Sequence, residues 1–111
     1  TGEAIVALRR ERGSSKTKGL CKLAIDEDMT IYAIKELTDA LTDELDGYDR
    51  FELSLAKVEE VDSAGIQLLL ALSTELEKRN KQFKVTEVSG AVSKLLATYN
   101  ISDRFDTGAA A

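Results

Sequence analysis

The feature that most constrains this chain is a change of hydrophobic period between residues 51 and 72. Residues 51–55 alternate between apolar and polar, which is the period-two pattern of a half-buried strand. Residues 68–72 are all apolar, and the stretch 61–66 between the two patterns contains three small residues in a row at 63–65. The sequence therefore predicts a strand, a turn and an apolar helix in direct succession.

The same order of elements is predicted on the N-terminal side of this stretch. Residues 20–25 have the pattern of a strand, and residues 26–28 that of a turn. Residues 29–32 then predict a short second strand, which would form a hairpin with the first. An amphipathic helix follows, because apolar residues recur at spacings of three and four. These apolar positions are Ile34, Leu37, Leu41 and Leu45.

On the C-terminal side, the apolar helix that follows the turn is expected to end near Asn80, and a further strand is predicted over 83–88. Ser89 and Gly90 predict the start of a last helix, and residues 101–105 a short turn that packs on the sheet. Strands that alternate with helices are typical of α/β folds. We therefore expect a mixed, mostly parallel sheet of about four strands, packed with about three to four helices.

Charge divides the chain into two parts. Residues 1–19 carry a net charge of +3, and residues 20–111 carry −8. The polar, basic segment 1–19 predicts a flexible leader, although residues 4–8 could add an edge strand. An acidic folded part argues against binding of nucleic acid, which requires Lys and Arg to neutralise phosphates.

The composition also argues against several classes of protein. The chain has no His, a single Cys and no glycine-rich phosphate loop. We therefore predict no enzymatic activity, no metal and no cofactor, with Cys21 as a buried apolar side chain. No apolar run is long enough to cross a membrane, and the N-terminus lacks the layout of a signal peptide. A monomeric, cytoplasmic protein is expected.

Ser63 is the residue most suited to a regulatory role. Its hydroxyl lies where strand-like sequence changes into helix, and a helix N-terminus offers unpaired N–H groups with partial positive charge. Two interpretations stay open at this point. Ser63 is either an N-cap of the helix or a group that carries a regulatory phosphate.

The residues described so far resemble the STAS domain family, which includes anti-sigma factor antagonists and domains of sulfate transporters. The resemblance covers about residues 20–106, and it depends on the order and spacing of several motifs rather than on one. The motifs are Asp62-Ser63-Ala64-Gly65 before the leucine-rich helix, Met29-Thr30-Ile31-Tyr32 before Ile34, Glu36 and Leu37, and the segment from Val85 to Phe105.

This resemblance implies a regulatory binding module. In phosphorylation-controlled members, the Ser or Thr after the aspartate is the acceptor, and this position is Ser63 here. The implied partners are an anti-sigma factor that is itself a serine kinase, and a phosphatase that restores binding. The implied partner-binding residues are Asp62, Ser63, Ala64, Gly65, Thr30, Ile31 and Tyr32. The domains expected are a leader (1–19), a STAS domain (20–106) and a frayed tail (107–111).

Thr30 departs from the family pattern. Several regulated members have an acidic residue at this position, after the apolar residue that ends the second strand. The form of residues 29–32 looks closer to STAS proteins associated with chemotaxis and to single-domain partners of lipid-transport ATPases. An accessory subunit of such an assembly is therefore the alternative function.

Overall fold

The structure is a computed structural model, and it describes residues 8–11, 13–15, 17–101 and 105. The elements, in chain order, are β1 (Leu8–Arg10), β2 (Leu20–Ile25), α1 (Ile34–Glu44), the 3-10 helix η2 (Leu45–Gly47), β3 (Arg50–Leu55), α2 (Ser63–Lys78), β4 (Gln82–Val88) and α3 (Gly90–Thr98). The described strands form one sheet in the order β1-β2-β3-β4, in which β2, β3 and β4 are parallel and β1 is antiparallel to β2. The predicted mixed, mostly parallel sheet with helical cover is thus confirmed.

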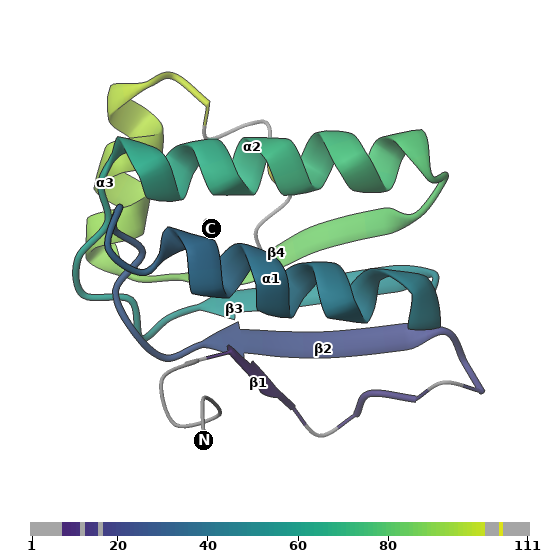
Figure 1. Cartoon of the computed structure of the whole chain (residues 1–111). Helices are drawn as coiled ribbons and strands as arrows, with labels where there is room; N and C mark the ends of the chain where they lie inside the picture. Colours follow the sequence, from purple (N-terminus) through teal and green to yellow (C-terminus); the bar gives the residue numbers. More distant parts are fainter. Residues whose placement is uncertain (1–7, 12, 16, 102–104, 106–111) are drawn as a thin grey trace.

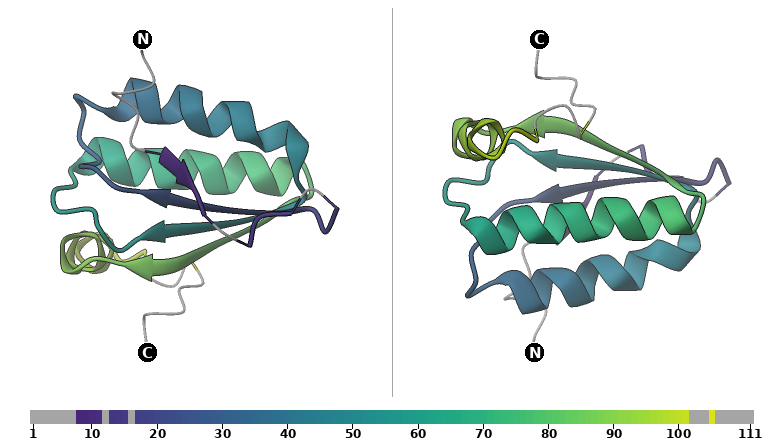
Figure 2. Two further views of the ribbon diagram at one scale, coloured as in Figure 1. Left: turned by 90° about the horizontal axis from the view of Figure 1, so that it is seen from below. Right: turned by 90° about the horizontal axis from the view of Figure 1, so that it is seen from above.

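Two helices cover one side of this sheet, and a third stands at the end of β4. Helices α1 and α2 run next to each other over one side, and both begin at the carboxyl ends of the parallel strands (Figure 1). Helix α3 stands at the end of β4, beside the start of α2, and its axis lies across those of α1 and α2 (Figure 2). The loops at this end of the sheet therefore bring the starts of all three helices close to one another.

The core lies between the sheet and helices α1 and α2. Alternate residues of β2 and β3 are buried, as their period-two pattern predicts, and they meet the apolar stripes of the two helices. The strand residues in this layer include Cys21, Leu23, Ile25, Phe51, Leu53 and Leu55, and the helix residues include Leu37, Leu41, Ile66, Leu69, Leu72 and Leu76. The heavily apolar α2 is mostly buried for this reason.

The prediction of a hairpin between residues 20–25 and 29–32 is wrong. Met29 forms an isolated parallel bridge with Val61, and residues 31–33 form a turn. The apolar character of Met29 has another cause, because its fully buried side chain packs under the start of α2. Ile31 and Tyr32 point largely into solvent, so their apolar side chains do not indicate a half-buried strand.

The segment 1–19 is not simply a leader. Leu8, Arg9 and Arg10 form β1 and pair with Ile25, Ala24 and Leu23 of β2, so strand pairing reaches into this segment. β1 is short and basic, and it lacks the alternation by which a strand is recognised in a sequence. Residues 4–7 of the possible edge strand and the predicted frayed tail 107–111 lie outside the described residues. Phe105 is buried and meets the ring of Phe83, as expected for residues 101–105.

Candidate functional site

The N-terminus of α2 is capped by Asp62, not by Ser63. Asp62 has an extended backbone, and its Oδ1 accepts hydrogen bonds from the N–H groups of Ala64 (2.9 Å) and Gly65 (3.3 Å). Ser63 is the first residue of the helix, and its side chain is exposed. The N-cap interpretation of Ser63 is therefore wrong, because the preceding carboxylate already accepts the helix N–H groups.

The second carboxylate oxygen of Asp62 holds the loop before α1. Asp62 Oδ2 accepts a hydrogen bond of 3.0 Å from the N–H of Ile31, and the Asp62 N–H donates to the carbonyl of Met29 at 3.2 Å. The backbone N–H groups that donate to its carboxylate, first that of Ile31 and then those of Gly65 and Ala64, lower the pKa of Asp62 below its ordinary value. Asp62 is thus anionic at neutral pH and connects the loop to the helix.

Hydrogen bonds also join the residues just before these, in the loop before α1 and in the loop before α2. The Met29 N–H donates to the carbonyl of Glu60 at 2.9 Å, and the Glu60 N–H donates to Asp28 Oδ1 at 3.0 Å. Residues 28–31 and 60–62 therefore form a continuous set of contacts, although they lie far apart in the sequence.

Gly65 allows this close approach of loop and helix. A Cβ atom at position 65 would lie 2.4 Å from the carbonyl oxygen of Met29 and 2.8 Å from Cγ2 of Val61. Real Cβ atoms do not come so close to other heavy atoms. The small residue in the Asp62–Gly65 motif is therefore required by packing, and its presence does not depend on a ligand.

The structure brings together all the residues that the family resemblance implied for partner binding. Ile31 and Tyr32 lie beside the start of α2, with exposed fractions of 67% and 93%. Thr30 is half-buried between them and Met29. A surface results in which two large apolar side chains and the Ser63 hydroxyl are open to solvent.

A groove next to Ser63 was not foreseen from the sequence. It has a volume of 370 Å³ and lies between α2 and the segment after α3. Its lining residues are Ser63, Ile66, Gln67, Leu70, Tyr99 and Ile101. Tyr99 belongs to the apolar face of the predicted last helix, but it is 48% exposed here. Nothing local in the sequence indicates this groove, since its two walls are distant along the chain.

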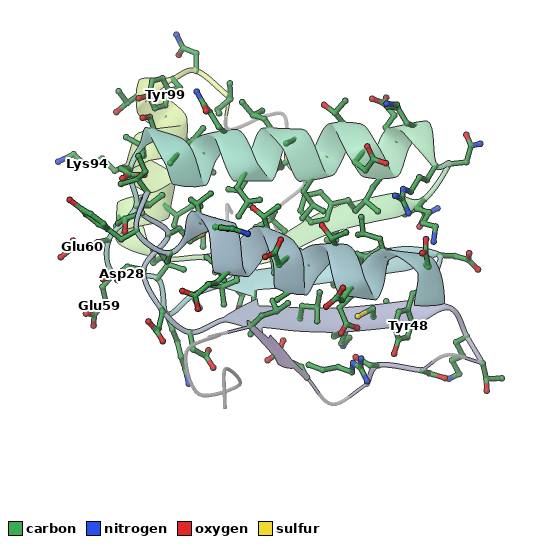
Figure 3. The ribbon with its side chains drawn as sticks, in the orientation of Figure 1. Asp28, Tyr48, Glu59, Glu60, Lys94 and Tyr99 are labelled. Atoms are coloured by element: carbon green, nitrogen blue, oxygen red, sulfur yellow. The ribbon has the colours of Figure 1, made fainter. Side chains whose placement is uncertain are left out.

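The loops around this end of the sheet are acidic. Asp28, Glu59 and Glu60 lie at the same end of the molecule as Lys94 and Tyr99, whereas Tyr48 lies at the opposite end (Figure 3). A second, 740 Å³ groove at this end is lined in part by Asp26, Glu27, Asp28 and Glu59. The surface near Ser63 therefore combines exposed apolar groups with negative charge.

Other kinds of site find little support in the described part of the chain. The described residues contain no group of three or more His, Cys, Asp or Glu that could hold a metal ion. Cys21 is fully buried, and burial, followed by the nearby Glu44 carboxylate, raises the pKa of its thiol to about 11. Such a thiol stays protonated at neutral pH and is a poor nucleophile. None of the helices formed by described residues is both long and apolar enough to span a membrane.

Several solved structures share this fold. An anti-sigma factor antagonist, SpoIIAA, in its unphosphorylated form has a TM-score of 0.72 and 14% identity, over 91% of this chain and 87% of that one. A protein of Thermotoga maritima described as a putative anti-sigma factor antagonist has a TM-score of 0.78 and 17% identity, over 90% and 84%. The phosphorylated form of SpoIIAA from Bacillus has a TM-score of 0.68 and 13% identity, over 91% and 90%. At such identities these likenesses show the fold alone.

Sequence comparison identifies the family. No curated protein matches the chain significantly. The sequence profile of a family described as "Mlab, STAS domain" matches residues 13–105, which is most of the chain. The matched region contains β2, β3, β4 and all three α-helices, together with the Asp62–Gly65 motif. The chain therefore belongs to the STAS domain family.

Proposed function

We propose that this protein is a regulatory protein-binding module, which relieves the inhibition of a sigma factor by occupying the corresponding anti-sigma factor. The partner docks on residues 30–32 and 62–65. The observation that carries the proposal is that Ile31, Tyr32 and Ser63 are all exposed. The Ile31 N–H is bonded to Asp62, the residue before Ser63, so the two segments lie side by side. Exposed apolar and aromatic side chains that lie together favour a contact with another protein. Structures of the same fold described as anti-sigma factor antagonists support this choice of partner.

Ser63 is proposed as the phosphorylation site that controls this contact. Its hydroxyl is exposed at the first position of α2, where a kinase can reach it. A phosphate adds about −1.5 to −2 charges and a hydration shell that a packed interface cannot accommodate without cost. The proposed partners are a kinase, which is the anti-sigma factor itself, and a phosphatase that removes the phosphate.

A second candidate function uses the same surface. Thr30 stands where several regulated members have an acid, and the Ile31 and Tyr32 side chains beside it are uncharged. An accessory subunit of a chemotaxis assembly or of a lipid-transport ATPase would bind there without a phosphorylation switch. Under both candidates the protein acts in the cytoplasm as a monomer, without a cofactor and without catalysis of its own.

Calorimetric titration tests the two candidates. The full chain is titrated against the anti-sigma factor and, separately, against the transporter ATPase encoded in the same genome. Tyr32→Ala and Ser63→Asp are each expected to weaken binding to the true partner about tenfold or more, which is roughly 1.4 kcal/mol. Thr74→Asp is the control, because it adds the same charge to an exposed position about 16 Å further along α2.

The outcomes of this titration distinguish the two candidate functions and test the proposed docking surface. Binding to the ATPase alone would favour the second candidate over the first. If both variants bind the partner as tightly as the parent chain, the surface formed by residues 30–32 and 62–65 is not the docking site, and the proposal fails.

A further inference from the structure

The carboxylate of Asp62 joins the two parts of the surface on which the proposed function rests. We propose that Asp62 is a positioning residue that transmits the phosphorylation state of Ser63 to the segment that carries Ile31 and Tyr32. In this proposal a phosphate on Ser63 displaces the Asp62 carboxylate, and the segment is released as a result. The inference depends on the proposed function, since it concerns the regulation of the same surface.

The contacts of Asp62 make it a bridge rather than a simple cap. One oxygen accepts from the N–H groups of Ala64 and Gly65 in α2, and the other accepts from the N–H of Ile31. Both oxygens belong to one rigid, planar group. A rotation that takes Oδ1 away from the helix therefore also moves Oδ2 away from Ile31.

The segment with Ile31 and Tyr32 has little else to hold it. Both side chains are mostly in solvent, so their own packing contributes little to its position. Its backbone is otherwise held through Ala33, whose N–H donates to the Thr30 carbonyl at 2.9 Å and whose carbonyl accepts from the Leu37 N–H of α1 at 3.1 Å. The exposed residues Ile31 and Tyr32 can thus shift once the contact with Asp62 is lost, while Met29 on one side and Ala33 on the other remain in place.

A phosphate on Ser63 competes directly with Asp62. A kinase forms a bond between Ser63 Oγ and the γ-phosphorus of ATP, the bond from that phosphorus to the β–γ bridging oxygen breaks, the hydroxyl proton passes to a base, and ADP leaves. The new group has three acceptor oxygens and more charge than a carboxylate. It favours the N–H groups at the start of α2 and repels the neighbouring anion. The carboxylate of Asp62 is the group that must move, because its N–H partners in α2 belong to the two residues that follow Ser63.

Amide hydrogen exchange, followed by NMR on the full chain, tests the inference without a partner. The chain is prepared with phosphoserine at position 63, and separately as Asp62→Ser and Asp62→Asn. Serine can still cap the N–H of Ala64 but has no second oxygen, and the amide group of asparagine can accept on only one side. We expect the Ile31 amide to exchange about tenfold faster or more in all three proteins. The Ala64 amide should remain protected in Asp62→Ser, and Thr74→Asp should match the parent.

The result also separates this inference from the proposed function. If phosphorylation abolishes binding while Ile31 exchanges as in the parent, the phosphate acts by its own bulk and charge, so the inference fails and the proposed function stands. If Ile31 exchange rises but binding is unchanged, the inference holds and the proposed phosphorylation switch fails. Unchanged Ile31 exchange in Asp62→Ser and Asp62→Asn would show that the bridge does not hold the segment.

Discussion

The two ends of the parallel sheet are built in different ways. At the end where the strands begin, Lys81 contacts the chain just after α1. Its Nζ donates to the backbone carbonyls of Leu45 and Tyr48, the latter at 2.7 Å. The same ammonium lies 5.9 Å from the centre of the Phe51 ring, and Tyr48 is buried against that ring. At the end where the strands finish, Ile31, Tyr32 and Ser63 are left exposed.

Ion pairs increase this contrast. Arg79, near the end of α2, contacts both Asp46 and Glu75 at 2.8 Å, and Arg10 of β1 contacts Glu44 at 2.7 Å. Such exposed pairs each contribute little to stability, but they add to the part-buried hydrogen bonds of Lys81 at the same end. The difference teaches that side chains at the end with Lys81 are used in contacts within the fold, whereas the end with Ser63 keeps polar and apolar groups available for binding.

The largest effect on the free energy of unfolding is expected from Gly65→Ala, which tests whether the end of the sheet with Ser63 is tightly packed beneath its exposed residues. The new methyl group would collide with the Met29 carbonyl at 2.4 Å, and this carbonyl is held in place by Asp62. We expect a loss of about 2 kcal/mol or more in the free energy of unfolding, measured with denaturant. Gly90→Ala is the matched control, because no atom lies within 4 Å of its added Cβ. A loss in Gly90→Ala as large as that in Gly65→Ala would show that the collision is not the cause.

A somewhat smaller effect is expected from Lys81→Met, which tests the other end. Methionine keeps the apolar stem but leaves two backbone carbonyls without their charged donor, at a cost of about 1.5 kcal/mol. Partner binding should be unchanged, since Lys81 lies at the end of the sheet opposite Ser63. Lys84→Met, at an exposed position of β4, should change stability by less than about 0.5 kcal/mol. A weaker interaction with the partner in Lys81→Met would contradict the proposed division between the two ends.

A further effect at the Lys81 end should appear only at high pH. The pKa of the Cys21 thiol is raised from 9.0 to about 11, mainly by burial, so the folded chain holds this proton more firmly than the unfolded chain. The resulting stabilisation is complete below pH 9 and is lost as the pH rises from 9 to 11. Denaturant melts across this range should show a steeper loss of stability in the parent than in Cys21→Ala. Parallel curves for the two proteins would mean that the thiol does not contribute.

The smallest effect on stability is expected from Ser63→Ala. The helix is capped by Asp62, so removal of the Ser63 hydroxyl should change the free energy of unfolding by less than about 0.5 kcal/mol. Asp62→Ala should cost about 1 kcal/mol in the same melts, because it removes the cap. If Ser63→Ala lost as much free energy of unfolding as Asp62→Ala, the Ser63 hydroxyl would be needed for the fold. The end of the sheet with Ser63 would then not differ from the end with Lys81.

Much of the fold could be predicted from the sequence because the signals were local. Two such signals predict which side of an element is buried: the alternation in residues 51–55, and the apolar stripe of Ile34, Leu37 and Leu41. The order of strands and helices then favours parallel pairing, since a crossover helix returns the chain in the same direction. The motif at Asp62–Gly65 also lies where a strand gives way to a helix, as the change of period predicts.

What only the tertiary structure decided depends on contacts between distant residues. Leu8–Arg10 form a strand because β2 offers an edge and Glu44 a partner for Arg10, not because three residues have a strand pattern. Met29–Tyr32 fail to form a strand because Met29 pairs with Val61 instead. The sequence by itself determined the periods and the motif that contains Ser63. The role of Asp62 came from folding alone, because one carboxylate can join residues 31 and 64 only when the chain has brought them within hydrogen-bond distance.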